Sequence, residues 1–259
     1  MSAAMSEAMA TAGDSVTTTV NFLLLHGLRG CGKRMVRRMQ DVLYRHTLLD
    51  HIYMDFVDAP GGQGNWGYDA LDAASEIPDP LKVTQSVERS VAMVEAKLQE
   101  AYEEGYPFHA VLAYSQGASL AALVASRVCH LESCKDLKWI LMAGDASFLW
   151  ELGVQSPIPV ASLHIAGRND WTVPFHESET LSRFFVEPRF FEHSGGHEFL
   201  PADTFLQVVD FLDLAVECCW CGRNSEGIEG IRFHMFSRRA FCNTCWVAYG
   251  GPWGYWPNA

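Results

Sequence analysis

Residues 109–120 read HAVLAYSQGASL. The run from His109 to Tyr114 is mostly apolar, which is typical of a buried strand, and the small residues after Ser115 favour a helix through Ser126. A strand that turns sharply into a helix with a serine at the corner is the G-x-S-x-G pattern of a nucleophile elbow. Positions 113–117 read AYSQG, so that alanine replaces one glycine of the pattern. The stretch alone is also compatible with an ordinary strand–helix junction that contains a serine.

The segments on either side of this stretch alternate between two kinds of apolar pattern. Short apolar runs predict strands, and runs with apolar residues at helical spacing predict helices. Strands that alternate with helices form a mostly parallel sheet covered on both faces, and a nucleophile elbow in such a sheet is typical of the α/β-hydrolase fold, which is the fold we expect. The predicted strands are 18–25, 52–57, 109–114, 138–143, 160–167 and 188–192, and the predicted helices are 33–46, 84–104, 116–126, 174–185 and 201–217.

Composition limits the classes of protein to which the chain can belong. Of its 259 residues, 49% are hydrophobic and 19% are charged, which indicates either one large globular domain or one domain with a small appendage. The net charge of −12 argues against a nucleic-acid partner. No apolar run approaches the roughly 18 residues that a membrane-spanning helix needs. We expect a disordered tail at 1–17, a hydrolase domain at 18–217 and a cysteine- and tryptophan-rich extension at 218–259. The oligomeric state stays open.

A glycine-rich turn, HGLRGCGK at 26–33, follows the first predicted strand and permits two interpretations. Gly27 to Lys33 matches the first seven positions of the nucleotide-binding P-loop, G-x-x-x-x-G-K, but Arg34 stands where that motif needs serine or threonine for Mg²⁺. The alternative is an oxyanion loop, in which the backbone N–H of Leu28 faces the reacting carbonyl.

Five basic residues lie on this turn and on the helix that follows it. Such a cluster is either a solvated helix face or a binding surface for an anionic tail of the substrate, such as a phosphate. The residues are Arg29, Lys33, Arg34, Arg37 and Arg38.

A long segment from Asp58 to Val83 is rich in glycine, proline and acidic residues and lacks clear periodicity. Long irregular insertions in compact domains are usually lids or binding loops, although a plain surface loop is the alternative. Trp66 and Tyr68 would give this segment an apolar underside. We therefore expect both to contact the substrate.

A serine hydroxyl becomes a nucleophile only with a histidine to take its proton and a carboxylate to hold that histidine. In the expected fold these groups follow the serine in the order acid, histidine, each after the end of a strand. Asp170 follows strand 160–167, and His197 lies on the glycine-rich loop after strand 188–192. Asp145 is an alternative acid and His193 an alternative base.

Two further histidines and a tryptophan lie near these positions. His164 lies inside a strand and is expected to be a hydrogen-bonded core residue. His176 and Trp171 lie close to Asp170 in sequence, and we expect both to line the substrate pocket without taking part in the chemistry.

Taken together, these motifs resemble the FSH family of serine hydrolases over about three quarters of the chain. The resemblance implies hydrolysis of carboxylic esters or thioesters, often of acyl chains, without a cofactor. It also implies that Ser115 is the nucleophile, Asp170 the acid and His197 the base, with the backbone N–H groups of Leu28 and Gln116 in the oxyanion hole. A hydrolase fold without activity that serves as a binding module is the alternative. The matching segments are LLLHGLRG, FVDAP, AYSQGASLA, IAGRNDWTVP and HSGGHEFLP.

The resemblance does not extend to the cysteine-rich end of the chain. Two C-x-x-C pairs, Cys218 with Cys221 and Cys242 with Cys245, are separated by twenty residues, a spacing typical of zinc sites. Four thiolates would form a closed, structural site, and residues 228–236 and 240–241 would form the hairpin of a zinc ribbon. Cys219 is either a spare or replaces Cys218, and reduced thiols without metal are the alternative. The first seventeen residues lack the basic start and the apolar core of a secretory signal. We therefore expect the cysteines to be reduced, which favours a cytoplasmic location.

Overall fold

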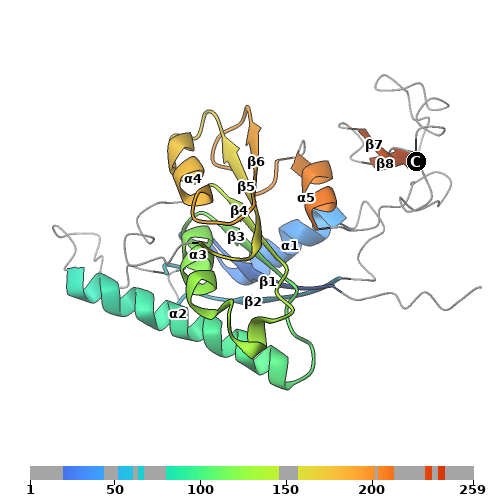
Figure 1. Ribbon diagram of the computed structural model, residues 1–259. Helices are drawn as coiled ribbons and strands as arrows, with labels where there is room; N and C mark the ends of the chain where they lie inside the picture. The colour runs from blue at the N-terminus through green and yellow to red at the C-terminus, as the bar shows by residue number, and fades with distance from the viewer. Residues whose placement is uncertain are drawn as a thin grey trace, which may run out of the picture.

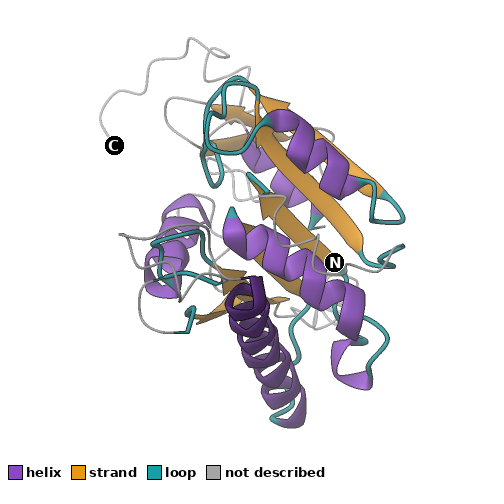
Figure 2. Ribbon diagram, turned by 90° about the vertical axis from the view of Figure 1, so that its left-hand side faces the viewer, coloured by secondary structure: helices purple, strands orange, loops and turns teal. Residues whose placement is uncertain are grey.

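A sheet of six parallel strands forms the centre of the molecule (Figures 1 and 2). The computed structural model describes residues 20–43, 52–60, 64–66, 80–145, 157–201, 204–212, 231–234 and 239–242. The strand order is β2-β1-β3-β4-β5-β6, and all neighbouring pairs are parallel, so the predicted sheet is confirmed. The strands are β1 (Val20–Leu25), β2 (Ile52–Val57), β3 (Ala110–Tyr114), β4 (Trp139–Ala143), β5 (Ala161–Gly167) and β6 (Pro188–His193).

Helices cover the sheet on both faces, as predicted. In Figure 1, α2, α3 and α4 lie on one side of the sheet, and α1 and α5 lie on the other. Successive strand residues point to opposite faces, so Leu23 and Leu25 belong to one buried cluster while Phe22 and Leu24 belong to the other. The helices are α1 (Gly32–Leu43), α2 (Pro80–Glu103), α3 (Gln116–Val128), the 3₁₀ turn η3 (Glu132–Cys134), α4 (Phe175–Ser182) and α5 (Phe205–Phe211).

The long helix α2 begins four residues before the predicted start at position 84. Pro80 is compatible with this start because the first turn of a helix does not use the N–H that proline lacks. Its predicted apolar face is buried, as Val87 and Val94 illustrate. The helix ends before Gly105, whose φ of +82° suits the residue that follows a helix.

The loops that follow β1, β3, β5 and β6 all leave the same edge of the sheet because the strands are parallel. These four loops carry the glycine-rich turn, Ser115, Asp170 and His197 respectively. The topology therefore brings distant parts of the sequence to one place.

The end of the chain contains a second, two-stranded antiparallel sheet, formed by β7 (Ile231–His234) and β8 (Arg239–Cys242). β7 lies within the predicted segment 228–236, whereas β8 extends the predicted segment 240–241 by one residue at each end. Cys242 is the last residue of β8, whereas Cys218, Cys221 and Cys245 lie outside the described residues, as does the predicted tail at 1–17. No group of three metal-binding side chains, and no helix long and apolar enough to cross a membrane, occurs in the part of the chain that the structure describes.

Candidate active site

Ser115 stands at the corner between β3 and α3 in a backbone conformation that is rare for residues other than glycine. Its φ is 54° and its ψ is −124°, a strained region that typically occurs at functional sites. The small residue at position 117 makes the turn possible, because a Cβ on Gly117 would lie 2.4 Å from the carbonyl oxygen of Leu25. Ala113, by contrast, is accommodated in the hydrophobic core. The sharp turn predicted from AYSQG is therefore present, and alanine suffices at its first position.

The side chains of Ser115, His197 and Asp170 form a hydrogen-bonded series. His197 Nε2 lies 3.0 Å from Ser115 Oγ, and His197 Nδ1 lies 2.6 Å from Asp170 Oδ2. The second oxygen of Asp170 accepts hydrogen bonds from the N–H groups of Thr172, at 2.8 Å, and Val173, at 2.9 Å. These bonds hold the carboxylate plane toward the imidazole. The arrangement can pass a proton from the hydroxyl to the imidazole while the carboxylate stabilises the resulting charge.

Two residues that the sequence analysis did not identify fix the imidazole of His197. The hydroxyl of Tyr114 donates a hydrogen bond to the carbonyl oxygen of His197 at 2.9 Å, and the two rings lie 4.9 Å apart between centroids. Burial raises the pKa of Tyr114 to about 12, so its hydroxyl stays protonated as a donor at neutral pH. On another side, a Cβ on Gly144 would lie 2.8 Å from His197 Cε1. Only glycine therefore leaves room for the ring there.

The turn after β1 lies beside the elbow, as an oxyanion loop requires. A Cβ on Gly27 would lie 3.0 Å from Ser115 Cβ, so the two backbones are in close contact. Within the described part of the chain, no group accepts a hydrogen bond from the N–H of Leu28 or from that of Gln116, the first residue of α3. The N–H of Gln116, at the start of α3, and the N–H of Leu28, on the adjoining loop, are thus both available to a ligand.

His26 braces this loop from inside the protein. Its Nε2 accepts a hydrogen bond from the N–H of Ala59 at 3.1 Å, so that Nδ1 carries the proton and donates to the carbonyl oxygen of Gly27 at 2.8 Å. Burial lowers the pKa of His26, which favours this neutral form. His26, which precedes Gly27 and Leu28, therefore supports the structure of the loop. Its place at the start of HGLRGCGK was the only sign of this role in the sequence.

Trp66 has a different place from the one predicted. Its side chain is fully buried, so it does not line a pocket open to substrate. The indole N–H donates to the carbonyl oxygen of His26 at 2.6 Å, and the indole packs on the His26 ring with centroids 4.7 Å apart. Its backbone carbonyl accepts a hydrogen bond from Ser90 on α2. Burial therefore corrects the predicted substrate contact: Trp66 anchors the oxyanion loop to the core.

Of the other three predicted substrate contacts, two are exposed and one lies outside the described residues. Trp171 follows Asp170 but is 94% exposed. His176 lies on the exposed side of α4. Tyr68 lies outside the described residues.

The geometry distinguishes the predicted acid and base from their alternatives. Asp145 and His164 are both fully buried and form a pair of their own, with Oδ2 and Nδ1 2.9 Å apart. His164 is therefore the hydrogen-bonded core residue that its position in a strand predicts. His193 is also buried, and its Nδ1 accepts a hydrogen bond from the N–H of Gly195 at 3.2 Å. Among the described contacts, Asp145 forms no hydrogen bond with His197, and His193 forms none with Ser115.

The P-loop interpretation finds no support in the turn itself. In a P-loop the N–H groups at the start of the helix hold phosphates. Here the N–H of Gly32, the first residue of α1, donates to the carboxylate of Asp58 at 2.6 Å. A negative side chain already occupies the position that a phosphate would take, and Lys33 points to solvent.

The sequence is similar to a known family and to several curated proteins. The family described as serine hydrolase (FSH1) matches residues 16–207. Esterase OVCA2 of Homo sapiens is 34% identical over 140 residues, which cover 51% of this chain and 57% of that protein. Esterase FPY3 of Fusarium mangiferae is 30% identical over 220 residues, which cover 76% of this chain and 95% of that protein. Esterase OVCA2 of Xenopus tropicalis matches over 46% of its length, so the chain spans about half the length of the OVCA2 proteins.

Solved structures show the same fold at low sequence identity. SOBER1 of Arabidopsis thaliana aligns with a TM-score of 0.56 at 17% identity, covering 76% of this chain and 98% of that one. Esterase PE8 aligns with a TM-score of 0.56 at 20% identity, covering 76% of this chain and 92% of that one. These likenesses support the α/β-hydrolase fold of the sheet and its covering helices.

Proposed function

The chain belongs to the FSH1 family of serine hydrolases, and from this we infer that it hydrolyses small carboxylic esters of acyl chains, with Ser115 as the nucleophile. The observation that carries the proposal is the series of hydrogen bonds from Ser115 Oγ through His197 to Asp170, at 3.0 and 2.6 Å. Esters are the substrate class that the names of the related proteins suggest. Thioesters of the same acyl chains are a second substrate class within this proposal.

The proposed reaction begins when Ser115 Oγ attacks the acyl carbonyl carbon while His197 Nε2 removes the hydroxyl proton. The carbonyl oxygen becomes an oxyanion, and the N–H groups of Leu28 and Gln116 stabilise it by about 3 kcal/mol each. His197 then gives its proton to the leaving alcohol or thiol, and the acyl group stays on Ser115. Water attacks this ester with His197 again as the base, which releases the acid. No step uses a cofactor.

Labelling with a fluorophosphonate probe tests this proposal. We expect covalent labelling at Ser115, and we expect Ser115→Ala to lower the turnover of p-nitrophenyl butyrate by roughly 10³-fold or more. Ser126→Ala is a matched control on the same helix, because its hydroxyl only donates to the carbonyl oxygen of Leu123. A Ser115→Ala protein with near-normal turnover would exclude the mechanism. Absence of labelling in the wild-type protein would favour the alternative of a binding module without activity. Esters of increasing chain length and acyl-CoA then define the substrate.

We also propose that the cysteine-rich end binds one structural zinc ion through Cys218, Cys221, Cys242 and Cys245. The spacing of the two C-x-x-C pairs and the β7–β8 hairpin that ends at Cys242 support this. We expect about one zinc per chain, lost in Cys242→Ser and kept in Cys129→Ser, which changes a cysteine of the hydrolase domain. A folded, active protein without zinc would contradict the proposal. The cytoplasmic location expected from the cysteines stays a prediction.

A further inference from the structure

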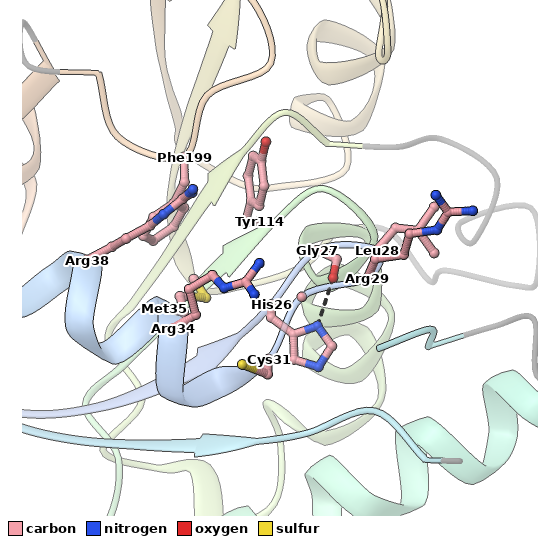
Figure 3. A pocket seen from close by; sticks show the side chains of 11 residues that line it. His26, Gly27, Leu28, Arg29, Cys31, Arg34, Met35, Arg38, Tyr114 and Phe199 are labelled. Carbon is pink, nitrogen blue, oxygen red and sulfur yellow. Dashed lines mark hydrogen bonds between the residues drawn. The ribbon is translucent and has the colours of Figure 1, made fainter. Parts of the chain in front are cut away.

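A cavity of about 190 Å³ lies directly beside the oxyanion loop and is not used by the proposed chemistry. Gly27 and Leu28 form one wall, the rings of Tyr114 and Phe199 form another, and α1 closes it with Arg34 and Arg38 (Figure 3). We propose that this cavity binds an anionic group, a carboxylate or a phosphate, at one end of the ester substrate. This inference rests on the function proposed above.

Arginine side chains give the lining of the cavity a positive charge. Among the described residues, no aspartate or glutamate lines it, and none forms an ion pair with Arg34 or Arg38. The carboxylate of Asp58 is nearby but is bound to the N–H of Gly32 at the start of α1. Three arginines, Arg29, Arg34 and Arg38, thus line one cavity in a chain with a net charge of −12.

The two arginines are placed to act together. They are four residues apart on α1, so their side chains lie on the same face of the helix, where like charges repel and destabilise it. An anion between them removes that repulsion, and guanidinium groups bind carboxylates and phosphates through paired hydrogen bonds. Figure 3 shows both side chains on the cavity side of α1, whereas the Arg29 side chain points away from them. The charge on the α1 side of the cavity therefore comes from Arg34 and Arg38, while Arg29 lines the cavity from the loop.

The position of the cavity connects it to the reacting bond. Its wall at Gly27 touches the elbow, since a Cβ there would lie 3.0 Å from Ser115 Cβ, and its wall at Leu28 carries an expected oxyanion donor. An ester whose carbonyl oxygen reaches the N–H of Leu28 can extend one arm into the cavity. The volume corresponds to roughly six water molecules, enough for an acid group and a short methylene chain. The buried Phe199 and Met35 would contact such a chain.

The proposal can be tested with two esters, one of which carries an additional negative charge. We expect the wild-type kcat/KM for mono-p-nitrophenyl glutarate, which ends in a carboxylate, to exceed that for neutral p-nitrophenyl butyrate. The double variant R34Q/R38Q should raise the KM for the glutarate ester about tenfold and leave the butyrate reaction unchanged. The matched control is K33Q/R37Q, which removes the same charge from exposed positions of the same helix that do not line the cavity. It should behave as the wild type.

Competition in the wild-type protein identifies the anion without relying on a variant. Glutarate and inorganic phosphate are each added during butyrate hydrolysis, and the one that inhibits at lower concentration indicates which anion the site prefers. Inhibition should weaken with added salt, because exposed charges are screened, and should be lost in R34Q/R38Q. The proposal is overturned if neither anion inhibits, or if K33Q/R37Q has the same effect as R34Q/R38Q. If butyrate itself is not hydrolysed and Ser115 is not labelled, the proposed function fails instead.

Discussion

One glycine, Gly144, determines where the imidazole of His197 can lie. Gly144 has a φ of +59°, and its missing side chain leaves the space that the His197 ring fills. Gly105 has a φ of +82°, but nothing lies within 4 Å of a Cβ there. The two positions thus share a backbone conformation that disfavours side chains and differ in what a side chain would meet.

This difference gives a prediction for two alanine variants. Gly144→Ala should lower kcat for p-nitrophenyl butyrate by roughly 10²-fold, because displacing a reacting group by about 1 Å can cost that much. Gly105→Ala should cost about 1 kcal/mol of stability through backbone strain and leave kcat unchanged. Steady-state kinetics and thermal melting measure both effects. Equal kcat values in the two variants would show that Gly144 does not position His197.

Two buried aspartates give a second prediction at this scale. Asp170→Asn should lower kcat by roughly 10⁴-fold with little change in stability, because an amide no longer holds the histidine tautomer that accepts the serine proton. Asp145→Asn should do the reverse, since Asp145 bonds to His164 in the core and forms no hydrogen bond with His197 among the described residues. Its loss should cost about 1–3 kcal/mol of unfolding free energy. Kinetics and chemical denaturation of both variants check this, and loss of activity in Asp145→Asn alone would reverse the assignment of the acid.

At the level of elements, the segment between β2 and α2 supports the oxyanion loop. The N–H of Arg29 donates to the carbonyl oxygen of Gly64 at 2.8 Å, and the indole of Trp66 donates to the carbonyl oxygen of His26. The loop is therefore tied at two points to residues that follow another strand. Its N–H groups can keep their direction without a ligand.

Trp66→Phe tests this support because phenylalanine keeps an aromatic ring and removes only the N–H donor. The carbonyl oxygen of His26 then stays buried without that partner, which should cost about 1–3 kcal/mol of stability. We expect kcat to fall more than KM changes, since the oxyanion donors act in the transition state. Trp171→Phe, at an exposed position, is the control and should change neither quantity. A normal kcat in Trp66→Phe would show that the oxyanion loop keeps its conformation without the hydrogen bond from the indole.

Trp66 also shows where sequence reasoning reaches its limit for this site. A tryptophan in a glycine-rich segment has the same sequence signal whether it faces a substrate or the core, and only the tertiary contacts distinguish the two. Similarly, Asp145 and Asp170 both follow strands, and only their spatial relation to His197 separates them. The elbow and the strands were predictable because buried parallel strands form continuous apolar runs. Helix ends were less so: α5 ends at Phe211, six residues before its predicted limit.

At the scale of the whole molecule, the buried His26 and the half-buried His109 make stability depend on pH. Burial lowers the pKa of His26 and of His109 from the ordinary value of 6.5. Between 6.5 and these lower values, the unfolded chain binds protons that the folded chain does not, so the free energy of unfolding falls as the pH falls. This contribution is fully present above pH 6.5.

We therefore expect the melting temperature to decrease from pH 6.5 to pH 5.5 and to change little between pH 7.5 and pH 6.5. Melting curves at these three values measure the effect. The variant His26→Asn removes one of the two groups and should flatten the slope below pH 6.5. A melting temperature that rises on acidification in this range would contradict the assignment of His26 as a neutral residue.

The anchoring of Trp66 affects which changes in sequence this part of the protein can tolerate during evolution. The indole of Trp66 and the carbonyl oxygen of Gly64 hold the oxyanion loop, and Ser90 on α2 holds the backbone of Trp66, so Trp66 is the last fixed point before the chain leaves this loop. Loop exchange between relatives should on this basis be tolerated when the exchanged piece begins after Trp66, and harmful when it begins before it.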